Sequence, residues 1–529
     1  MKVINFIKNH TTILPFCFFL ILIVFVYGQS LKYDYTYLDD DTLVLRNYDF
    51  ISNYKNIPRF FSKSVFYSSG DSFYRPILTL SFFVDAMIAG KKPFMYHLSG
   101  IVFHIISVFL IFVFFRKMQF DETLTFLFVS LFAVHPALLS AVAWIPGRND
   151  TILTIFVLLS VIFLFDYFEN NKKIISKFII FAFMFFVALF TKESAIAMLV
   201  VIPVFMFFFC KNTSKKDYFT VFLTMFFIAF MYTVARTIAL GGASSNMAFD
   251  FFKSAKSIFV YLEYIIIPSR IYLVTEKLTV DFLTVISCVI FFVPVVASLF
   301  FNIGRKKIVL FGLLWFVAFL APSFMSPNDN FLLLTHRLYS ASLGVMFIFI
   351  EFFTAVSVKI KLSKKYLYFM LIIFIVLFTF TSFMQVKKFQ NRETYFFNAL
   401  NEQPDSEILR AKVAGFYAEK GMLEEAKKEI LSIKSEDGSH SAVYYGMLAY
   451  IYSLEGSYDK AIEIFERLIA VNPHDEIAIY SAGGIYFLQG EYGKALEYAE
   501  RLLNIRPEQL IYQERYNKFK AAYDENLGK

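Results

Sequence analysis

Long apolar runs recur along this chain of 529 residues up to about residue 385. A helix that crosses a bilayer needs about 20 mostly apolar residues. Eleven runs approach this length, at 13–27, 96–115, 122–143, 151–168, 177–191, 194–210, 218–239, 281–302, 308–325, 338–358 and 366–384. Only 18% of the residues are charged and 58% are hydrophobic, so the whole chain cannot be one soluble globular domain. The runs predict an all-α, polytopic bundle of about eleven transmembrane helices.

Clusters of basic residues predict the orientation of this bundle, because Lys and Arg in short loops stay on the cytoplasmic side. Two predicted spans separate each cluster from the next. The clusters are Lys2 and Lys8, Arg116 and Lys117, Lys172, Lys173 and Lys177, Lys211, Lys215 and Lys216, Arg305 to Lys307, and Lys359, Lys361, Lys364 and Lys365. We expect a cytoplasmic N-terminus. The net charge of +8 then reflects membrane loops and not a nucleic-acid partner.

The segment 255–275 is also apolar, but counting it as a span would place Arg305 and its basic neighbours on the opposite side. We therefore interpret it as a re-entrant or interfacial helix. The number of spans stays odd, which predicts that everything after residue 384 is extracytoplasmic. Cys17, Cys210 and Cys288 lie in or at the ends of apolar runs, so the sequence offers no disulfide framework and no zinc site.

A repeat of 34 to 35 residues begins where the composition turns polar. Its recurring residues are Gly421, Gly456 and Gly490, Ala426, Ala461 and Ala495, Tyr417, Tyr452 and Tyr486, and Pro473 and Pro507. Glycine suits a tight turn between two helices, alanine lets the helices approach closely, and proline ends the second helix. This is the tetratricopeptide pattern. We predict a membrane domain at 1–399 and an α-solenoid of about three tetratricopeptide repeats at 400–529.

Adjacent carboxylates in the first outer loop are candidates for catalysis. Asp39, Asp40 and Asp41 follow the first span closely, and mutual repulsion would raise one pKa towards a value suited to a general base. The alternative interpretation is a solvated acidic run that caps a helix. We take Asp39 and Asp40 as the candidate catalytic residues.

Further ionisable residues fall on the same predicted face. They are Arg75, His97, Arg148, Asp150, Lys192, Glu193, His336 and Arg337. Singly, each has an ordinary explanation, such as a snorkelling cation, a packed histidine or a simple ion pair. Together they suit transfer from a lipid-phosphate donor to a hydroxyl group, because cations neutralise the phosphate that leaves while a carboxylate accepts the proton. We assign these eight residues to substrate binding.

Several motifs, taken in order along the chain, resemble the transmembrane and tetratricopeptide-repeat (TMTC) proteins. The motifs are Tyr37 to Asp40 with Asn47, Tyr74 to Ile77, Pro93 to His97 with His104, Phe132 to Pro136, Ala141 to Trp144, Gly147 to Asp150, Thr191 to Ser194, and Arg337 to Gly344. The resemblance implies a GT-C fold and an inverting glycosyltransferase that uses a polyprenyl-phosphate sugar, with or without a metal ion. The family has bacterial relatives, and the resemblance to these implies a location in a bacterial inner membrane. It also implies that Asp39 and Asp40 form the acidic pair of the active site and that Asp150 is a second-loop acid.

The leading hypothesis is thus a membrane glycosyltransferase whose acceptor is a protein or a glycan, with the repeats presenting that acceptor. No cofactor is required, although Asp39, Asp40 and Asp150 could bind a divalent cation. One alternative is a non-catalytic scaffold whose repeats recruit partners for envelope assembly. Another is a lipid-glycan polymerase or ligase. A transporter is disfavoured, because the charges gather at one face and not at the middle of the membrane.

Overall fold

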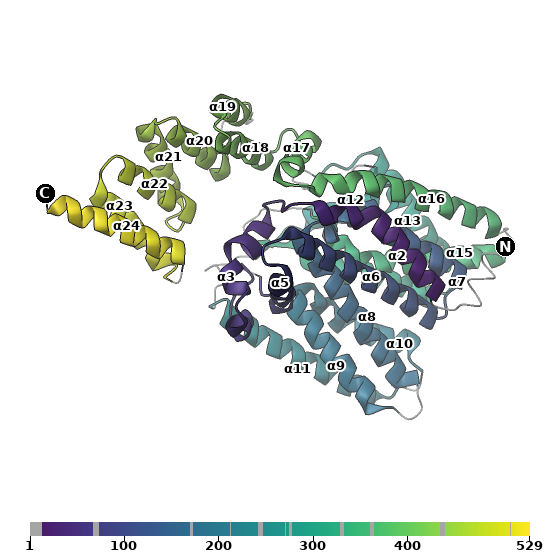
Figure 1. Ribbon diagram of the computed structural model, residues 1–529. Coiled ribbons are helices and arrows are strands. Elements are labelled where there is room, and N and C mark those ends of the chain that lie inside the picture. The colour runs from purple at the N-terminus through teal and green to yellow at the C-terminus, as the bar shows by residue number, and fades with distance from the viewer. Residues whose placement is uncertain are drawn as a thin grey trace. The chain divides into compact units, whose positions relative to one another are not determined.

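The chain folds into two compact units, residues 1–392 and 393–529, in a computed structural model (Figure 1). The structure describes residues 13–66, 73–169, 173–211, 213–241, 247–269, 271–273, 278–327, 333–359, 364–433, 440–507 and 509–528. The basic residues Lys2, Lys8, Lys172 and Lys361, which helped to predict the orientation, lie outside these ranges.

The first unit is a bundle of helices, as the apolar runs predict. Its α-helices are α2 (Ile13–Tyr27), α3 (Tyr48–Ile51), α4 (Ile57–Phe60), α5 (Pro76–Ala89), α6 (Pro93–Lys117), α7 (Glu122–Ala133), α8 (Arg148–Glu169), α9 (Ile175–Thr191), α10 (Met198–Phe209), α11 (Lys215–Ala239), α12 (Phe251–Ile266), α13 (Phe282–Phe300), α14 (Lys306–Leu320), α15 (Leu338–Lys359) and α16 (Lys364–Gln385). Within the described residues, β-structure is confined to β1 (Met247–Phe249) and β2 (Met325–Pro327), which pair antiparallel with Ala248 opposite Ser326.

Short 3-10 and π-helical segments join these helices and carry three of the candidate residues, Glu193, His336 and Arg337. They are η1 (Gly28–Lys32), η2 (Asp41–Arg46), η3 (Tyr54–Asn56), η4 (Pro136–Ala141), η5 (Ile145–Gly147), η6 (Glu193–Ala197), η7 (Ala321–Phe324), η8 (Thr335–Arg337) and η9 (Val386–Phe389).

Eight helical segments of the described chain are long and apolar enough to cross a membrane. They are Ile13–Lys32, Pro93–Lys117, Ile145–Glu169, Lys215–Ala239, Phe282–Phe300, Lys306–Phe324, Thr335–Lys359 and Lys364–Phe389. The other three predicted spans form shorter apolar helices, Glu122–Ala133, Ile175–Thr191 and Glu193–Phe209. The run 122–143 is divided because Pro136 follows α7 and begins the separate segment η4.

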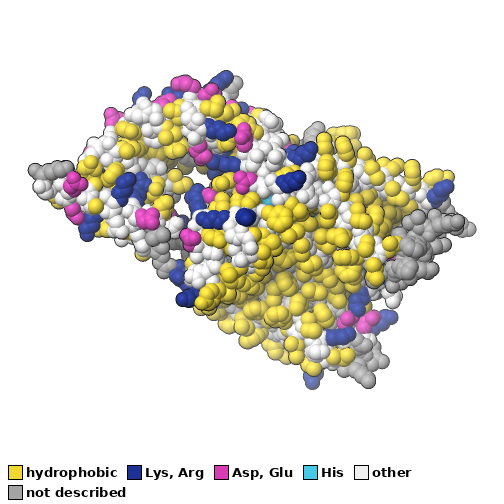
Figure 2. Space-filling view, viewed as in Figure 1, with side chains coloured by type: hydrophobic (Ala, Val, Ile, Leu, Met, Phe, Trp, Pro, Cys, Tyr) yellow, Lys and Arg dark blue, Asp and Glu magenta, His cyan; other side chains and the backbone are white. Residues whose placement is uncertain are grey.

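The surface and the packing of the first unit suit a bilayer. Hydrophobic side chains cover most of the visible face of this unit (Figure 2). Inside the bundle, α14 and α15 touch through Gly312 and Gly344, where a Cβ atom on Gly312 would lie 2.6 Å from the Gly344 carbonyl oxygen. Small residues allow such close backbone approach between membrane helices. The chain is therefore an integral membrane protein.

Helix α12 lies in the segment that we interpreted as re-entrant or interfacial. It has 16 residues and buries Ser257, Tyr261 and Tyr264 in the bundle, whereas Phe251 and Phe252 at its start are exposed. It packs along α13 and is not among the eight segments that are long and apolar enough to span. Whether it lies at the membrane interface stays a prediction.

The second unit consists of helix pairs, as the repeat predicts. Its helices are α17 (Arg392–Glu402), α18 (Glu407–Glu419), α19 (Leu423–Leu431), α20 (Ala442–Leu454), α21 (Tyr458–Val471), α22 (Glu476–Leu488), α23 (Tyr492–Ile505) and α24 (Leu510–Leu527). Gly421, Gly456 and Gly490 adopt φ angles of 76°, 78° and 80° at the turns within the pairs, a region that favours glycine. The three repeated alanines are fully buried where the paired helices meet.

The boundary between the units falls earlier than the predicted position of 399/400. The division lies between Arg392 and Glu393. Phe397 of α17 packs edge-on against Phe416 and Tyr417 of α18, with ring centroids 5.8 Å and 5.7 Å apart. These aromatic contacts attach α17 to the repeats.

Candidate functional site

Helix ends bring candidate residues from distant parts of the sequence to one place. Arg75 directly precedes α5, Asp150 lies in the first turn of α8, and Lys192 directly follows α9. Glu193 begins η6, and His336 and Arg337 lie in η8, which leads directly into α15. We call Arg75, Asp150, Lys192, Glu193, His336 and Arg337 the polar cluster.

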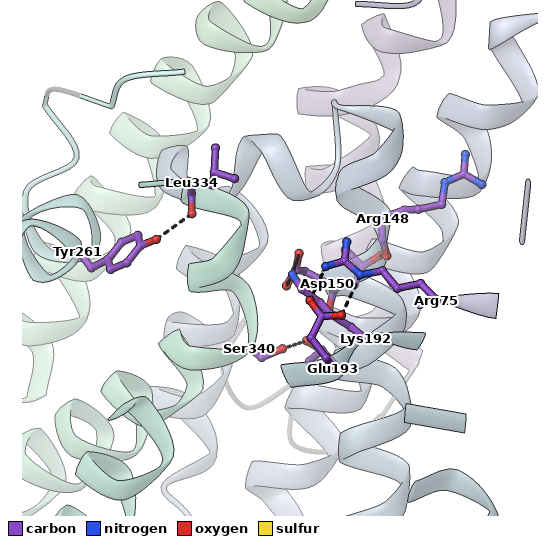
Figure 3. Close-up of polar contacts among 10 residues, drawn as sticks. Arg75, Arg148, Asp150, Lys192, Glu193, Tyr261, Leu334 and Ser340 are labelled. Atoms are coloured by element: carbon purple, nitrogen blue, oxygen red, sulfur yellow. Dashed lines mark hydrogen bonds and ion pairs between the residues drawn. The ribbon is translucent and has the colours of Figure 1, made fainter. Parts of the chain in front are cut away.

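Two ion pairs form the centre of the polar cluster (Figure 3). The Lys192 Nζ atom donates to both carboxylate oxygens of Asp150, at 2.7 Å and 2.8 Å. The Arg75 guanidinium donates to both oxygens of Glu193, and the bond from Nε is 3.0 Å long. Bidentate contacts of this kind fix the direction of a guanidinium as well as its charge.

A neighbouring amide joins the two pairs. The side chain of Asn149 is oriented so that its nitrogen donates to the Thr191 carbonyl oxygen at 2.9 Å and its oxygen accepts from Arg75 Nη1 at 3.2 Å. Asn149 is buried and directly precedes Asp150. It therefore ties the start of α8 to the end of α9 and to Arg75.

Close packing around Gly147 explains why the segment before Asp150 can turn as it does. A Cβ atom on Gly147 would lie 1.9 Å from the Ser140 carbonyl oxygen, so only glycine allows η4 and η5 to approach this closely. The Ser140 hydroxyl also forms a 2.8 Å hydrogen bond with that of Thr335. Gly147 and Ser140 thus position Asp150 on one side and η8 on the other.

His336 and Arg337 complete the polar cluster from η8. The charges of Arg75 and Lys192 act on His336, and that of Arg337 acts on Asp150. Arg337 Nη1 donates to the Ser323 carbonyl oxygen at 3.1 Å. Tyr261 of α12 hydrogen-bonds with the Arg337 side chain and donates to the Leu334 carbonyl oxygen at 3.2 Å (Figure 3).

The side chains of the polar cluster differ in exposure, from buried to partly accessible. The exposed fractions of the side chains are 4% for Asp150, 8% for Lys192, 17% for Arg75 and 34% for Glu193. His336 and Arg337 are half-buried. With its histidine neutral, the cluster contains three cations and two carboxylates. A partly exposed group with an excess of positive charge can bind an anion such as a phosphate.

Arg148 lies apart from the polar cluster, in contrast to its expected place around a donor phosphate. Its side chain is fully buried, forms an ion pair with Asp85 and donates to the Tyr96 carbonyl oxygen. Arg148 Nε donates to the Ile145 carbonyl oxygen at 3.2 Å. Figure 3 shows the side chain directed away from Arg75 and Asp150. Arg148 therefore holds α5, α6 and α8 together, because each of its donors is used inside the fold.

The first loop separates the two candidate catalytic carboxylates. Asp40 is fully buried and accepts from the Thr36 amide at 2.7 Å, the Leu38 amide at 2.9 Å and the Thr36 hydroxyl. Burial raises the pKa of Asp40 from 3.8 to about 6, although these hydrogen bonds oppose the shift. Asp39 is exposed. Asp40 therefore fixes the loop, whereas Asp39 is accessible to a substrate.

The start of the same loop is attached to α6. His97 is buried, its Nε2 atom lies 3.4 Å from the Asp34 carbonyl oxygen, and its ring meets Tyr33 edge-on at 6.3 Å. Tyr35 packs on Tyr96 at 6.0 Å and lies close to the charges of both Asp40 and Arg148. The contacts of the described residues thus connect Asp40 with Arg148 and place His97 beneath the loop, outside the polar cluster.

An apolar groove extends from the region of Tyr261 along α15. It has a volume of about 340 Å³ and includes Ile265 of α12, Ser342 and Phe353 of α15, and Phe378 of α16. Ile265 follows Tyr261 by one helical turn, and Ser342 follows Arg337 by little more than one turn. Two residues of the groove are thus close in the chain to Tyr261 and Arg337, and the other lining residues belong to the apolar bundle.

The sequence did not identify Asn149, Tyr261 or Trp144 as site residues, nor Asp85 as the partner of Arg148. Asp85 was detectable as a lone carboxylate in an apolar helix, which is costly unless the charge is paired. The described residues contain no group of three His, Cys, Asp or Glu side chains placed to hold a metal ion. Independence from a cofactor stays a prediction.

The fold defines a polytopic helical membrane protein with a tetratricopeptide-repeat unit. Residues 453–523 match the tetratricopeptide-repeat family model. The chain has homologues in the TMTC family of protein O-mannosyl-transferases. It is 31% identical over 144 residues to protein O-mannosyl-transferase TMTC2 of Mus musculus, a match that covers 26% of this chain and 17% of that protein.

Other relatives in this family are similarly distant. Protein O-mannosyl-transferase TMTC1 of Mus musculus is 29% identical over 142 residues, covering 25% of this chain and 15% of that protein. Protein O-mannosyl-transferase F38B6.6 of Caenorhabditis elegans is 30% identical over 106 residues, covering 20% of this chain and 15% of that protein. The matches thus span less than a fifth of the relatives' length. The predicted resemblance to the TMTC family is confirmed over the matched part.

Proposed function

We propose that this protein is a membrane glycosyltransferase that moves a sugar from a polyprenyl-phosphate donor to a hydroxyl group of a protein. The proposal depends chiefly on the polar cluster, in which Arg75, Lys192 and Arg337 come together at helix ends next to an apolar groove. The names of the homologues, which are protein O-mannosyl-transferases, support this class of reaction. A glycan hydroxyl is the alternative acceptor.

The cations of the polar cluster would bind the phosphate of the donor. Cleavage of the bond between sugar and phosphate leaves a second negative charge on the phosphate, and nearby cations stabilise that charge as it develops. Arg75 is held in a fixed direction by Glu193, and Lys192 by Asp150. Arg337 precedes the groove residue Ser342 by little more than one helical turn, so its side chain would bind the phosphate of a lipid held in the groove.

The apolar groove would hold the first isoprene units of the donor. Its described lining contains Phe132, Phe349, Phe374 and other apolar residues, which match a hydrocarbon chain. The volume of about 340 Å³ accommodates only part of a long polyprenyl chain, so the remainder would lie in the bilayer.

The exposed carboxylate of Asp39 would accept the proton of the attacking hydroxyl group. Asp40 would act through the loop, since its oxygens are occupied by Thr36 and Leu38. In this role Asp40 is a positioning residue, and Asp39 is the base. The reaction needs no cofactor in this scheme, because a carboxylate and three cations supply the proton transfer and the charge stabilisation.

We assign the reaction to the extracytoplasmic face. The polar cluster lies at the starts of α8 and α15 and at the end of α9, and the basic clusters predicted to be cytoplasmic lie at the opposite ends of these helices. The Asp34 amide donates to the Gln390 carbonyl oxygen at 2.9 Å, so the chain leaves the bundle beside the first loop. In this proposal the repeat unit presents the acceptor.

Replacement of Asp39 tests this function. In membranes supplied with a polyprenyl phosphate mannose, the Asp39→Asn variant should transfer mannose to protein about 10²- to 10⁴-fold more slowly, the range expected for loss of a general base. The product is measured by mass spectrometry of extracytoplasmic proteins. The matched control is Asp49→Asn, because Asp49 is an exposed carboxylate of the same loop region.

Undiminished transfer by the Asp39→Asn variant would refute the base assignment. A wild-type protein that transfers no sugar while its repeats still recruit envelope proteins would favour the scaffold. Sugar found only on glycolipids would favour a polymerase or ligase.

A further inference from the structure

Trp144 and His336 form an aromatic corner next to the polar cluster. Their ring centroids lie 5.4 Å apart with an angle of 44° between the ring planes. Both side chains are half-buried. Trp144 lies directly before η5, which leads into α8, and His336 belongs to η8, which leads into α15. The corner therefore lies between the start of α8, which carries Asp150, and the start of α15, which follows Arg337.

The indole nitrogen of Trp144 is buried and has no hydrogen-bond partner in the described part of the chain. The His336 ring likewise makes no hydrogen bond to any described residue. A buried donor that finds no acceptor destabilises the folded state. Buried N–H groups without a protein partner are often satisfied by a ligand or an ordered water molecule.

The polar atoms of this corner match the chemistry of a hydroxyl group. The indole offers one N–H donor, and a neutral imidazole offers one donor and one acceptor. Arg75, Lys192 and Arg337 lie near enough for their charges to act on His336. These cations would bind the phosphate, so the corner is left for a neutral group. The corner is thus a neutral aromatic surface next to a cationic one.

We propose that this corner binds the sugar ring of the donor, with an apolar face of the ring on Trp144, one sugar hydroxyl accepting from the Trp144 N–H and another hydrogen-bonded to His336. Recognition of a sugar suits such a corner, because the ring has an apolar C–H face and hydroxyl groups at its edge. The inference rests on the proposed function. It assigns recognition of the sugar to Trp144, whereas the cations of the polar cluster bind the phosphate.

The tryptophan content of the chain gives a direct test, because the sequence contains only Trp144 and Trp315. Trp315 is fully buried, and its Nε1 atom donates to the Ser340 carbonyl oxygen at 2.8 Å. In the full-length Trp315→Phe variant, all tryptophan emission comes from Trp144. A short-chain polyprenyl phosphate mannose should change this emission, whereas the same polyprenyl phosphate without sugar should change it at least fivefold less. If Trp315→Phe does not fold, the difference spectrum between wild type and Trp144→Phe gives the same signal.

Binding measurements on Trp144→Phe separate sugar recognition from phosphate recognition. This variant retains an aromatic ring but lacks the N–H group, so the Kd for the mannose-bearing lipid should rise about five- to tenfold, as expected for one lost hydrogen bond. The Kd for the sugar-free lipid phosphate should stay within twofold of wild type. Lys192→Met serves for comparison, because it should weaken binding of both lipids.

The outcomes distinguish the two proposals. If both lipids bind, Lys192→Met weakens both and Trp144→Phe weakens neither, the sugar corner is refuted while phosphate binding by the polar cluster stands. If neither lipid binds to the wild-type protein, the proposed function fails and this inference fails with it. An equal change of Trp144 emission with both lipids would show that the corner senses the lipid phosphate and not the sugar.

Discussion

Asp39 and Asp40 are neighbours in the sequence, but they occupy different environments. The carboxylate of Asp40 is enclosed by its own loop, where Tyr37 adopts a φ angle of 56° and the Thr36 and Leu38 amides point inward. Asp39 faces outward. The two residues would therefore differ in function, one as a proton acceptor and the other as a structural anchor.

The titration of Asp40 should appear in the pH dependence of stability. Burial raises its pKa to about 6 in the folded protein, above the ordinary 3.8, so the folded state binds more protons between these values. The stability of the wild-type protein should therefore fall as pH rises from about 4 to 6, by up to roughly 3 kcal/mol. Asp40→Asn lacks this titration, and its unfolding temperature relative to wild type should rise across that window.

Unfolding of the two proteins in detergent at pH 4 to 7.5 measures the effect. Asp49→Asn is the control, because an exposed carboxylate should leave the curve unchanged. Parallel curves for wild type and Asp40→Asn would contradict an elevated pKa at Asp40.

The Lys192–Asp150 pair should show strong coupling, since both side chains are less than a tenth exposed. Removal of one partner leaves an uncompensated buried charge, which costs about 3–5 kcal/mol. We expect Lys192→Met and Asp150→Asn each to lower the unfolding temperature clearly. The double variant should be more stable than the sum of the single effects by about 1–3 kcal/mol. Additive effects would show that the pair does not interact in the folded protein.

At the scale of elements, the site depends on the breaks between helices. Pro136 ends the run that would have continued α7, and Lys192 adopts an extended conformation between α9 and η6. Each break places charged or polar side chains at a helix end, where they can contact polar groups from other helix ends. Uninterrupted spans would have left Lys192 and Glu193 inside the hydrocarbon at a high cost.

Gly147→Ala should disturb this arrangement. The new Cβ atom would meet the Ser140 carbonyl oxygen at 1.9 Å, so η4 and η5 must separate. Overpacking of this kind costs about 1–3 kcal/mol. A shift of about 1 Å at Asp150 should lower transfer up to about 10²-fold. The readouts are the unfolding temperature and the rate of mannose transfer.

Gly28→Ala is the matched control for Gly147→Ala. A Cβ atom on Gly28 would lie 3.6 Å from the Val24 side chain, an ordinary contact, so activity and stability should change little. Equal effects of the two substitutions would mean that the close approach at Gly147 is unimportant for the site.

At the scale of the whole molecule, the orientation in the membrane determines which compartment supplies the donor and the acceptor. The polar cluster and the predicted cytoplasmic clusters lie at opposite ends of α8, α9 and α15. Basic residues at the end predicted to be cytoplasmic form ion pairs with acids of the bundle, for example Arg305 with Glu351 at 2.7 Å. The bundle thus has chemically distinct ends.

Cysteine labelling in intact cells tests the orientation. A membrane-impermeant maleimide should label Asp49→Cys and Lys520→Cys without permeabilisation, because the first loop and the repeat unit are predicted to be extracytoplasmic. Lys359→Cys should be labelled only after permeabilisation. All three positions are exposed in the structure. Wild type is the background control, and labelling of Lys359→Cys in intact cells would reverse the orientation.

The sequence by itself determined the helical class, most of the long spans and the repeats, because apolar run length and the spacing of Gly, Ala and Tyr are local properties. It also indicated that Arg75, Asp150, Lys192, Glu193, His336 and Arg337 share a face. Only the tertiary structure separated Arg148 from these residues and Asp40 from Asp39, and only it brought Asn149, Tyr261 and Trp144 to the site. Which side chains form ion pairs and hydrogen bonds depends on distances between segments that are far apart in the chain. A local sequence pattern does not contain these distances.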